Sequence, residues 1–286
     1  MQSLNYYLQK AKSEYFAVPH FNVSNLEMIK AIVEASQELN APVMIGMSES
    51  EREFIGLNQA KSIIKCYKEK GAVIFLNADH SKSFDSCKNA IDAGFDSIHF
   101  DGSHLSLKEN FEITKKVVLY GKKKNVDISI EGELGCMPTE SSKIYNKEIK
   151  IDKKYFTKPE EAREFTENTG IDRLASVIGS IHGIALNNPH LDIDLIKRIS
   201  LEVGDVSLVL HGGSGVLPSD IKNAIKAGIN NIHISTELRI IYKESLDKSL
   251  DKDNIAPYSI MEPVIKDMKE FIKEKIKFFE AKNKCK

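Results

Sequence analysis

The chain has 286 residues, of which 42% are hydrophobic and 28% are charged, and its formal net charge is -1 at pH 7. These values are ordinary for a soluble globular protein that can bury a large core, and the balance of acidic and basic residues disfavours a nucleic-acid partner. The N-terminus lacks a secretory signal pattern, and no apolar run approaches the roughly 20 residues of a membrane span, so we expect no membrane partner.

Short apolar runs recur along the chain and predict eight strands. In chain order these strands cover residues 16–23, 42–47, 72–78, 97–100, 126–130, 174–178, 207–210 and 231–234. Runs that are apolar almost throughout are typical of parallel strands covered on both faces.

Helical segments separate the strands. Ser24 with Glu27, and Ser106 with Glu109, form the S-x-x-E pattern that begins a helix, and Gly94 is placed to end one. We expect helices over residues 3–13, from 24, over 84–93, from 106, from 159, over 194–203 and from 218, followed by two closing helices separated near Pro257 and Pro263.

Eight strand–helix alternations in a chain of this length predict an α/β fold, a (β/α)8 TIM barrel. We expect one domain, residues 1–286, with a short N-terminal helix and extra C-terminal helices. An internal repeat supports the barrel, because residues 88–99 match residues 222–233 at most positions. Each copy reads as a helix, a glycine that ends it and a strand, as repeated βα units require.

Polar residues follow the carboxyl ends of the predicted strands. They are Ser48, Asp79, His80, Asp101, Glu133, His182, His211 and Ser235. In a barrel these strand ends meet at one mouth, where active sites are built.

Three of these residues, His80, His182 and His211, follow three different strands. Three histidines with an open fourth position are the ligand set of a catalytic zinc ion. The four cysteines are scattered and form no C-x-x-C pair, so we expect reduced thiols in a cytoplasmic protein. A metal would therefore be held by histidines and carboxylates.

The segment His211-Gly-Gly-Ser-Gly215 lies between a predicted strand and the helix that begins near Pro218. Backbone N–H groups in such a glycine-rich turn, together with a helix N-terminus, suit a phosphate group. The same glycines could also form only a tight turn.

Five motifs occur in order along the chain: Asp79-His80, Asp101-Gly-Ser103, Glu131-Gly-Glu-Leu-Gly135, Gly179-Ser-Ile-His-Gly183 and His211-Gly-Gly-Ser-Gly215. With them, the sequence resembles the class II, metal-dependent ketose-bisphosphate aldolases, the fructose- and tagatose-bisphosphate aldolases, over nearly its whole length. The resemblance implies reversible, zinc-dependent cleavage of fructose 1,6-bisphosphate to dihydroxyacetone phosphate and glyceraldehyde 3-phosphate in glycolysis and gluconeogenesis. Tagatose 1,6-bisphosphate is the alternative substrate, and a homodimer or homotetramer is implied.

The resemblance also implies a role for individual residues. His80, His182 and His211 would hold the zinc ion, and Asp79 would move the proton of the substrate's C4 hydroxyl. Asp101 and Glu133 match carboxylates that can take a second divalent or monovalent cation. The dihydroxyacetone-phosphate end would be bound by Gly183, Gly212, Gly213, Ser214, His233, Ser235 and Thr236. The other phosphate would meet Ser48, and the mobile loop after the fifth strand would supply Glu140 as a second acid/base.

Two departures from the family pattern concern the substrate preference and the assignment of Glu140. The family usually has asparagine where this chain has His233, and Pro138 stiffens the loop that carries Glu140. Asp101 and Glu133 could instead orient the ligand histidines, and alternation along the strand places His99 on the same inward side as Asp101.

Two other functions fit parts of the pattern. A catalytically silent barrel that partners an active aldolase is disfavoured because Asp79 and the three histidines are retained. A barrel-type metal hydrolase leaves the predicted phosphate cradle unexplained. A Schiff-base mechanism is disfavoured because no lysine follows a strand end except Lys82.

Overall fold

A computed structural model describes residues 2–285 except 136, 138, 140, 141, 188, 189, 251, 252 and 254. Eight parallel strands close into a barrel in the order β1-β10-β9-β7-β5-β4-β3-β2. These strands are β1 Val18–Asn22, β2 Val43–Met47, β3 Ile74–Ser81, β4 Ser97–Phe100, β5 Ser129–Leu134, β7 Arg173–Ser176, β9 Ser207–Leu210 and β10 Ile229–Ile234. The predicted TIM barrel is confirmed.

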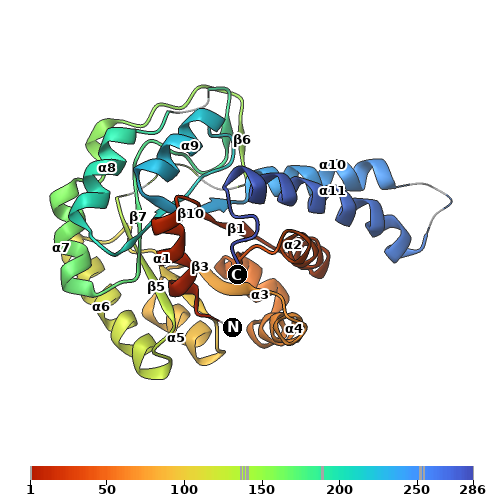
Figure 1. Cartoon of the computed structure of the whole chain (residues 1–286), viewed down its shortest axis with the longest axis horizontal. Helices are drawn as coiled ribbons and strands as arrows, with labels where there is room; N and C mark the ends of the chain where they lie inside the picture. Colours follow the sequence, from red (N-terminus) through yellow and green to blue (C-terminus); the bar gives the residue numbers. More distant parts are fainter. Residues whose placement is uncertain are drawn as a thin grey trace.

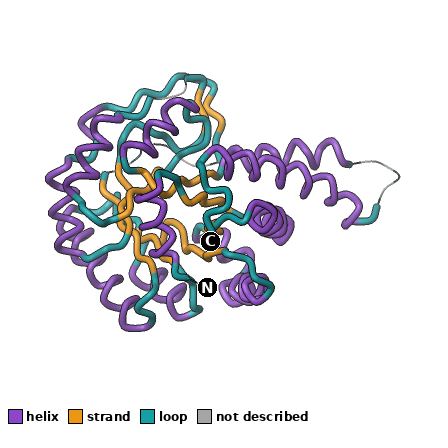
Figure 2. Tube along the Cα trace, viewed as in Figure 1, coloured by secondary structure: helices purple, strands orange, loops and turns teal. Residues whose placement is uncertain are grey.

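Helices surround the barrel (Figure 1). They are α1 Leu4–Glu14, α2 Leu26–Leu39, α3 Glu49–Ile55, α4 Leu57–Glu69, α5 Phe84–Asp92, α6 Leu107–Lys124, α7 Pro159–Thr169, α8 Ile193–Glu202, α9 Pro218–Ala227, α10 Thr236–Ser249 and α11 Pro257–Phe278. A 3-10 turn (η1 Lys153–Tyr155) and a small sheet of β6 Ile144–Tyr145 and β8 Ile184–Ala185 lie outside the barrel. Helices α10 and α11 run side by side and project from the rest of the molecule (Figures 1 and 2).

Two predicted strand boundaries were wrong in ways that affect the site. The fifth strand was expected at 126–130, but β5 begins only at Ser129, because Asn125 accepts a bond from the Asp127 N–H in a turn and Val126 is exposed. The third strand runs three residues beyond its predicted end and includes Asp79 and His80.

The two predicted capping boxes had different outcomes. Ser106 and Glu109 form the reciprocal bonds that begin α6, as predicted. The prediction for α2 was wrong, because Asn25 caps that helix by accepting a bond from the Met28 N–H. The Ser24 hydroxyl donates instead to Glu51, so it contributes to the mouth of the barrel.

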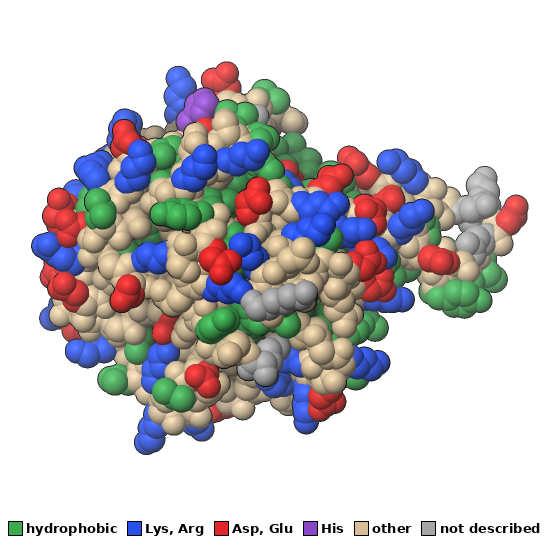
Figure 3. Space-filling view, viewed as in Figure 1, with side chains coloured by type: hydrophobic (Ala, Val, Ile, Leu, Met, Phe, Trp, Pro, Cys, Tyr) green, Lys and Arg blue, Asp and Glu red, His purple; other side chains and the backbone are tan. Residues whose placement is uncertain are grey.

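Charged side chains of both signs intermix over the face shown in Figure 3. Every residue of the barrel strands except His80 is buried. In the described residues no helix is both long enough and apolar enough to cross a bilayer. The described cysteines Cys66, Cys87 and Cys285 are free thiols.

Candidate active site

The end of β3 has an irregular backbone that presents two consecutive side chains to the barrel mouth. The register between β3 and β4 shifts between Ala78 and Ser81, and His80 has a φ of 45°. A left-handed residue other than glycine costs about 1–3 kcal/mol and persists only where its surroundings fix it. Arg52 provides this fixation, because its buried guanidinium donates to the Asp79 carbonyl at 3.0 Å and to the Ser81 hydroxyl at 3.1 Å.

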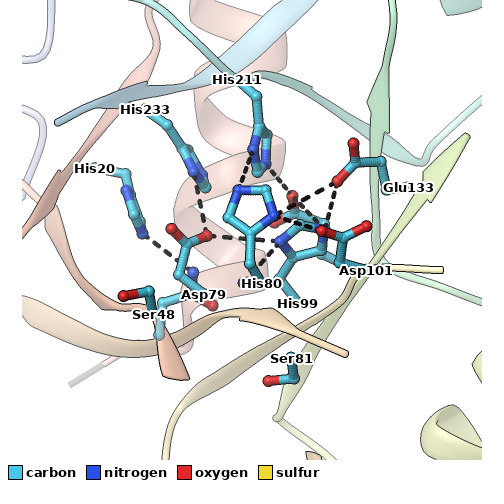
Figure 4. A network of polar contacts seen from close by, with 12 residues as sticks. His20, Ser48, Asp79, His80, Ser81, His99, Asp101, Glu133, His211 and His233 are labelled. Carbon is cyan, nitrogen blue, oxygen red and sulfur yellow. Dashed lines mark hydrogen bonds and ion pairs between the residues drawn. The ribbon is translucent and has the colours of Figure 1, made fainter. Parts of the chain in front are cut away.

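The three predicted metal-ligand histidines lie together at this mouth. The ring centroids of His80 and His211 are 4.9 Å apart, those of His80 and His182 are 5.2 Å apart, and those of His182 and His211 are 5.9 Å apart. His80 Nε2 and His211 Nδ1 face each other at 3.2 Å (Figure 4). Two nitrogens bound to one tetrahedral zinc ion lie about 3.3 Å apart, so this pair fits zinc.

Carboxylates hold the outer nitrogens of two of these rings. Asp101 Oδ2 lies 2.9 Å from His80 Nδ1, and Glu131 Oε1 lies 2.7 Å from His211 Nε2. Such contacts fix the orientation of a ligand ring and leave the other nitrogen free to bind the metal. Glu131 was missed as a site residue because the predicted strand ended one residue before it. Its signal was its place as the first acid of the Glu131-Gly-Glu motif.

The third ring, His182, follows β7, and its backbone N–H donates to the Thr139 hydroxyl at 2.8 Å. Burial, reinforced by the neighbouring His80 and His211 rings, lowers the pKa of His182 to about 3. The imidazole is therefore neutral at pH 7, which is the form that can bind a metal ion.

Glu133 and Asp101 approach the opposite side of His80. Glu133 Oε2 lies 3.8 Å from His80 Nδ1 and 3.1 Å from the buried His99 Nε2. His80, Asp101 and Glu133 each offer a ligand atom within 4.8 Å of the others, so this group could hold a second cation or orient the His80 ring. His99 lies inside the barrel, as the alternation predicted.

Asp79 lies beside the histidines as a buried carboxylate. Its Oδ2 accepts a hydrogen bond from the Asn22 amide at 2.9 Å, and its Oδ1 lies 3.6 Å from His99 Nδ1. Burial alone would raise the pKa of the Asp79 carboxyl, but the His80 and His99 rings outweigh burial and hold this pKa well below its usual range. The group is therefore ionised and can accept a proton.

A stacked pair of imidazoles forms part of the wall near Asp79. The rings of His20 and His233 are 3.6 Å apart and almost parallel, and His233 Nδ1 lies 3.7 Å from Asp79 Oδ1. A Cβ on Gly46 would lie 2.1 Å from the His20 ring, so only glycine there leaves room for it. Burial lowers the pKa of His20 to about 4 and that of His233 well below its usual range, which makes both rings neutral.

Asp79, the three histidines and His233 line one hollow with a volume of about 530 Å³, which includes its open mouth. Its lining residues are Asn22, Ser48, Asp79, His80, His182, Gly183, His211, Gly212, Ser214, His233, Ser235, Thr236 and Arg239. The predicted residues Asp101, Glu133 and Gly213 are not among them. Asp101 and Glu133 line an adjoining hollow that shares His80 and His182 with the first, and the Gly213 N–H donates to the His233 carbonyl. Glu140 lies outside the described residues.

The glycine-rich turn after β9 closes one side of this hollow. Gly212 has a φ of 64°, and a Cβ there would lie 2.0 Å from the Ile181 carbonyl oxygen. The absence of a side chain therefore lets the turn that carries His211 approach the segment that carries His182. The N-terminus of α10 lies at the same place, since Ser214 Oγ accepts from the Glu237 N–H at 3.3 Å.

Arg239 adds a positive charge that the sequence analysis missed. This residue lies in the first turn of α10, lines the hollow with Ser48 and pairs with Glu51. Glu51 also accepts bonds from the Ser48 N–H at 2.8 Å and the Ser24 hydroxyl at 3.0 Å. Ser48 and the Arg239 guanidinium thus share Glu51 as a partner and form one polar part of the hollow. The turn after β9 forms another polar part.

Known proteins resemble the chain over its whole length. Residues 2–284 match the family model described as fructose-bisphosphate aldolase class-II. A fructose-bisphosphate aldolase from Staphylococcus aureus (strain Mu50) is 37% identical, with 99% of each chain covered. A Bacillus licheniformis protein named 6-phospho-5-dehydro-2-deoxy-D-gluconate aldolase is 34% identical, covering 99% of this chain and 96% of that protein. The crystal structure of the YdjI aldolase from Escherichia coli K12 superposes with a TM-score of 0.86 at 30% identity, covering 99% and 98% of the two chains.

Proposed function

Because the chain belongs to the class-II fructose-bisphosphate aldolase family and is thus a carbon–carbon lyase, we propose that it reversibly cleaves fructose 1,6-bisphosphate. The products are dihydroxyacetone phosphate and glyceraldehyde 3-phosphate, as in glycolysis and gluconeogenesis. The observation that carries this proposal is the meeting of three histidines and Asp79 in a single hollow. Relatives named for different substrates share the aldolase activity, so the substrate itself is part of the proposal.

In the cleavage direction, Asp79 takes the proton from the C4 hydroxyl as the C3–C4 bond breaks. The electron pair of that bond moves to C3 and is delocalised toward the C2 carbonyl oxygen. His80, His182 and His211 would hold a zinc ion, which would supply Lewis-acid stabilisation of the developing negative charge. A second acid then protonates C3, and we assign this role to Glu140.

The described residues lining the hollow include no lysine, which supports metal rather than Schiff-base catalysis. We assign the dihydroxyacetone-phosphate end to the turn after β9 and to the start of α10, because the positive end of a helix and a glycine-rich turn favour phosphate. Gly183, Gly212, Ser214 and Ser235 line this part. We assign the other phosphate to Ser48 and Arg239, whose guanidinium suits a phosphate oxygen pair.

A coupled assay on fructose and tagatose 1,6-bisphosphates, with and without zinc, tests this function. Removing the metal with a chelator is expected to lower kcat/KM by about 10³-fold, because Lewis-acid stabilisation contributes several kcal/mol. Added zinc should restore the activity. Turnover that survives chelation but is lost to borohydride in the presence of substrate would instead indicate a lysine Schiff base. A higher kcat/KM for tagatose 1,6-bisphosphate would change the substrate and leave the aldolase class intact.

We propose that the chain assembles as a homodimer or homotetramer. The projecting α10–α11 pair supports this, because large apolar side chains are exposed at its far end, Tyr258 in α11 and Leu250 and Ile255 in the segment between the helices. Light scattering is expected to give two or four times the chain mass of 32.1 kDa. A mass equal to one chain across micromolar concentrations would contradict the proposal.

We also propose a cytoplasmic location. The free thiols of the described cysteines support it, because oxidising compartments favour disulfides. Recovery of the protein mainly from a secreted or periplasmic fraction would contradict this location.

A further inference from the structure

A fully buried arginine lies inside the barrel beneath the three histidines. Arg173 begins β7, and its guanidinium lies 2.6 Å from Glu131 Oε2. It also donates to Ser129 Oγ at 3.2 Å, to Asn231 Oδ1 at 2.9 Å and to Asn77 Oδ1 at 3.3 Å. One side chain thereby connects strands β3, β5, β7 and β10.

The neighbouring strands leave room for this side chain. Asn77 on β3, Ser97 on β4 and Ser129 on β5 lie in register with one another. Each carries a small polar side chain that accepts a bond from Arg173, where a TIM barrel ordinarily packs branched apolar residues. An interior built in this way indicates a specific use for the guanidinium, since a buried charge is costly unless it is paired.

The use of the guanidinium follows from the two oxygens of Glu131. Arg173 binds Oε2, so Oε1 is directed at His211 Nε2, 2.7 Å away. With that nitrogen held, His211 presents Nδ1 to His80 Nε2 at 3.2 Å, the spacing that suits a shared zinc ion. Arg173 therefore contacts Glu131, and Glu131 in turn contacts His211.

We infer that Arg173 is a positioning residue, which fixes Glu131 and through it the His211 ring, and so strengthens zinc binding. This inference depends on the proposed zinc site. A purely structural Arg173 would fill the barrel interior and tie its strands together without affecting the metal. The positioning role and the structural role can be told apart, because only the positioning role of Arg173 depends on Glu131.

Zinc affinity of the apoprotein, measured by competition with a chromophoric chelator, distinguishes these roles. Arg173→Met is expected to raise the zinc Kd by about 10–100-fold, the usual cost of losing a residue that supports a metal ligand. In a Glu131→Ala background the same substitution should change the Kd by less than about threefold, because coupled residues are not additive. Arg163→Met is the matched control, since Arg163 is half exposed and pairs with Glu202 on the surface.

The visible spectrum of bound cobalt(II) provides a second readout. Arg173→Met should change this spectrum while the far-ultraviolet circular dichroism of the apoprotein stays the same. An unchanged Kd in a folded Arg173→Met variant, or an equal effect with and without Glu131, would overturn the inference. If Arg173→Met or the Glu131→Ala background fails to fold, Arg173→Gln decides. It keeps a polar side chain and loses the charge that holds Glu131, so a wild-type Kd in it would likewise overturn the inference.

Failure of the proposed function would look different. A wild-type chain that binds no zinc would remove the proposed metal site itself. Tight zinc binding by the wild type that is insensitive to Arg173 would remove only the positioning role.

Discussion

Asp79→Asn is expected to lower kcat by about 10³-fold while the zinc Kd changes by less than about threefold. The substitution keeps the size and polar character of the side chain but removes the charge, and an amide cannot accept the proton of the C4 hydroxyl. General acid–base catalysis by one positioned group contributes about 10²–10⁴-fold. Asp79 suits this role because it is ionised, and the Asn22 amide holds Oδ2 at 2.9 Å.

Separate measurements of kcat and zinc affinity make the Asp79 prediction specific. Asp85→Asn is a suitable control, because Asp85 is an exposed carboxylate in the first turn of α5. Normal turnover by Asp79→Asn would remove Asp79 from the mechanism. A loss of turnover that merely follows a loss of zinc would show that Asp79 supports the metal and does not transfer the proton.

The strand ends that carry the site were largely predictable from the sequence. Parallel strands covered by helices must be apolar, so the polar residues that interrupt them at His80, Asp101 and His211 stand out. Once a barrel is assumed, these residues must lie close together, because the carboxyl ends of its strands meet at one mouth. Their shared position at one mouth follows from topology.

Residues inside the barrel were harder to predict. Because strands were predicted from apolar runs, the sixth predicted strand began at Leu174. The structure shows that this strand, β7, begins one residue earlier, at the charged Arg173. The reliance on apolar runs also ended the fifth strand before Glu131, because Val126 and Ile128 look like strand residues while a turn at Asn125 delays the start of β5. Both errors have one cause. Arg173 and Glu131 can be buried because their opposite charges pair inside the barrel. The local sequence does not show that two residues so far apart along the chain form a pair.

The close contact between two loops was also not predictable. The sequence shows that Gly212 follows His211, but only the structure places its Cα against the Ile181 carbonyl. Likewise, nothing in the local sequence marks Arg52 as a site residue, and its bonds to the end of β3 depend on how α3 packs against that strand. Long-range packing decides such contacts, and a single sequence does not encode them in a readable pattern.

His182→Ala is expected to weaken zinc binding by more than about 100-fold and to lower kcat/KM to a similar degree. Loss of a direct ligand should exceed the roughly 10–100-fold cost of losing a residue that only supports one. Within the described part of the chain the His182 ring makes no hydrogen bond, and its contacts are with the rings of His80 and His211. Removing it therefore leaves no donor or acceptor unpaired, and we expect the free energy of unfolding of the apoprotein to change by only about 1 kcal/mol.

This combination separates a metal ligand from a structural histidine. A structural residue would lower the stability of the apoprotein and leave the zinc Kd nearly unchanged, whereas a ligand does the reverse. His190→Ala is the matched control, because that ring is largely exposed and its partner is Asp220, away from the hollow. Chelator competition gives the Kd, and thermal unfolding of the metal-free proteins gives the stability. If His182→Ala binds zinc as tightly as the wild type, the three histidines do not share one ion, and the proposed mechanism loses its electron sink.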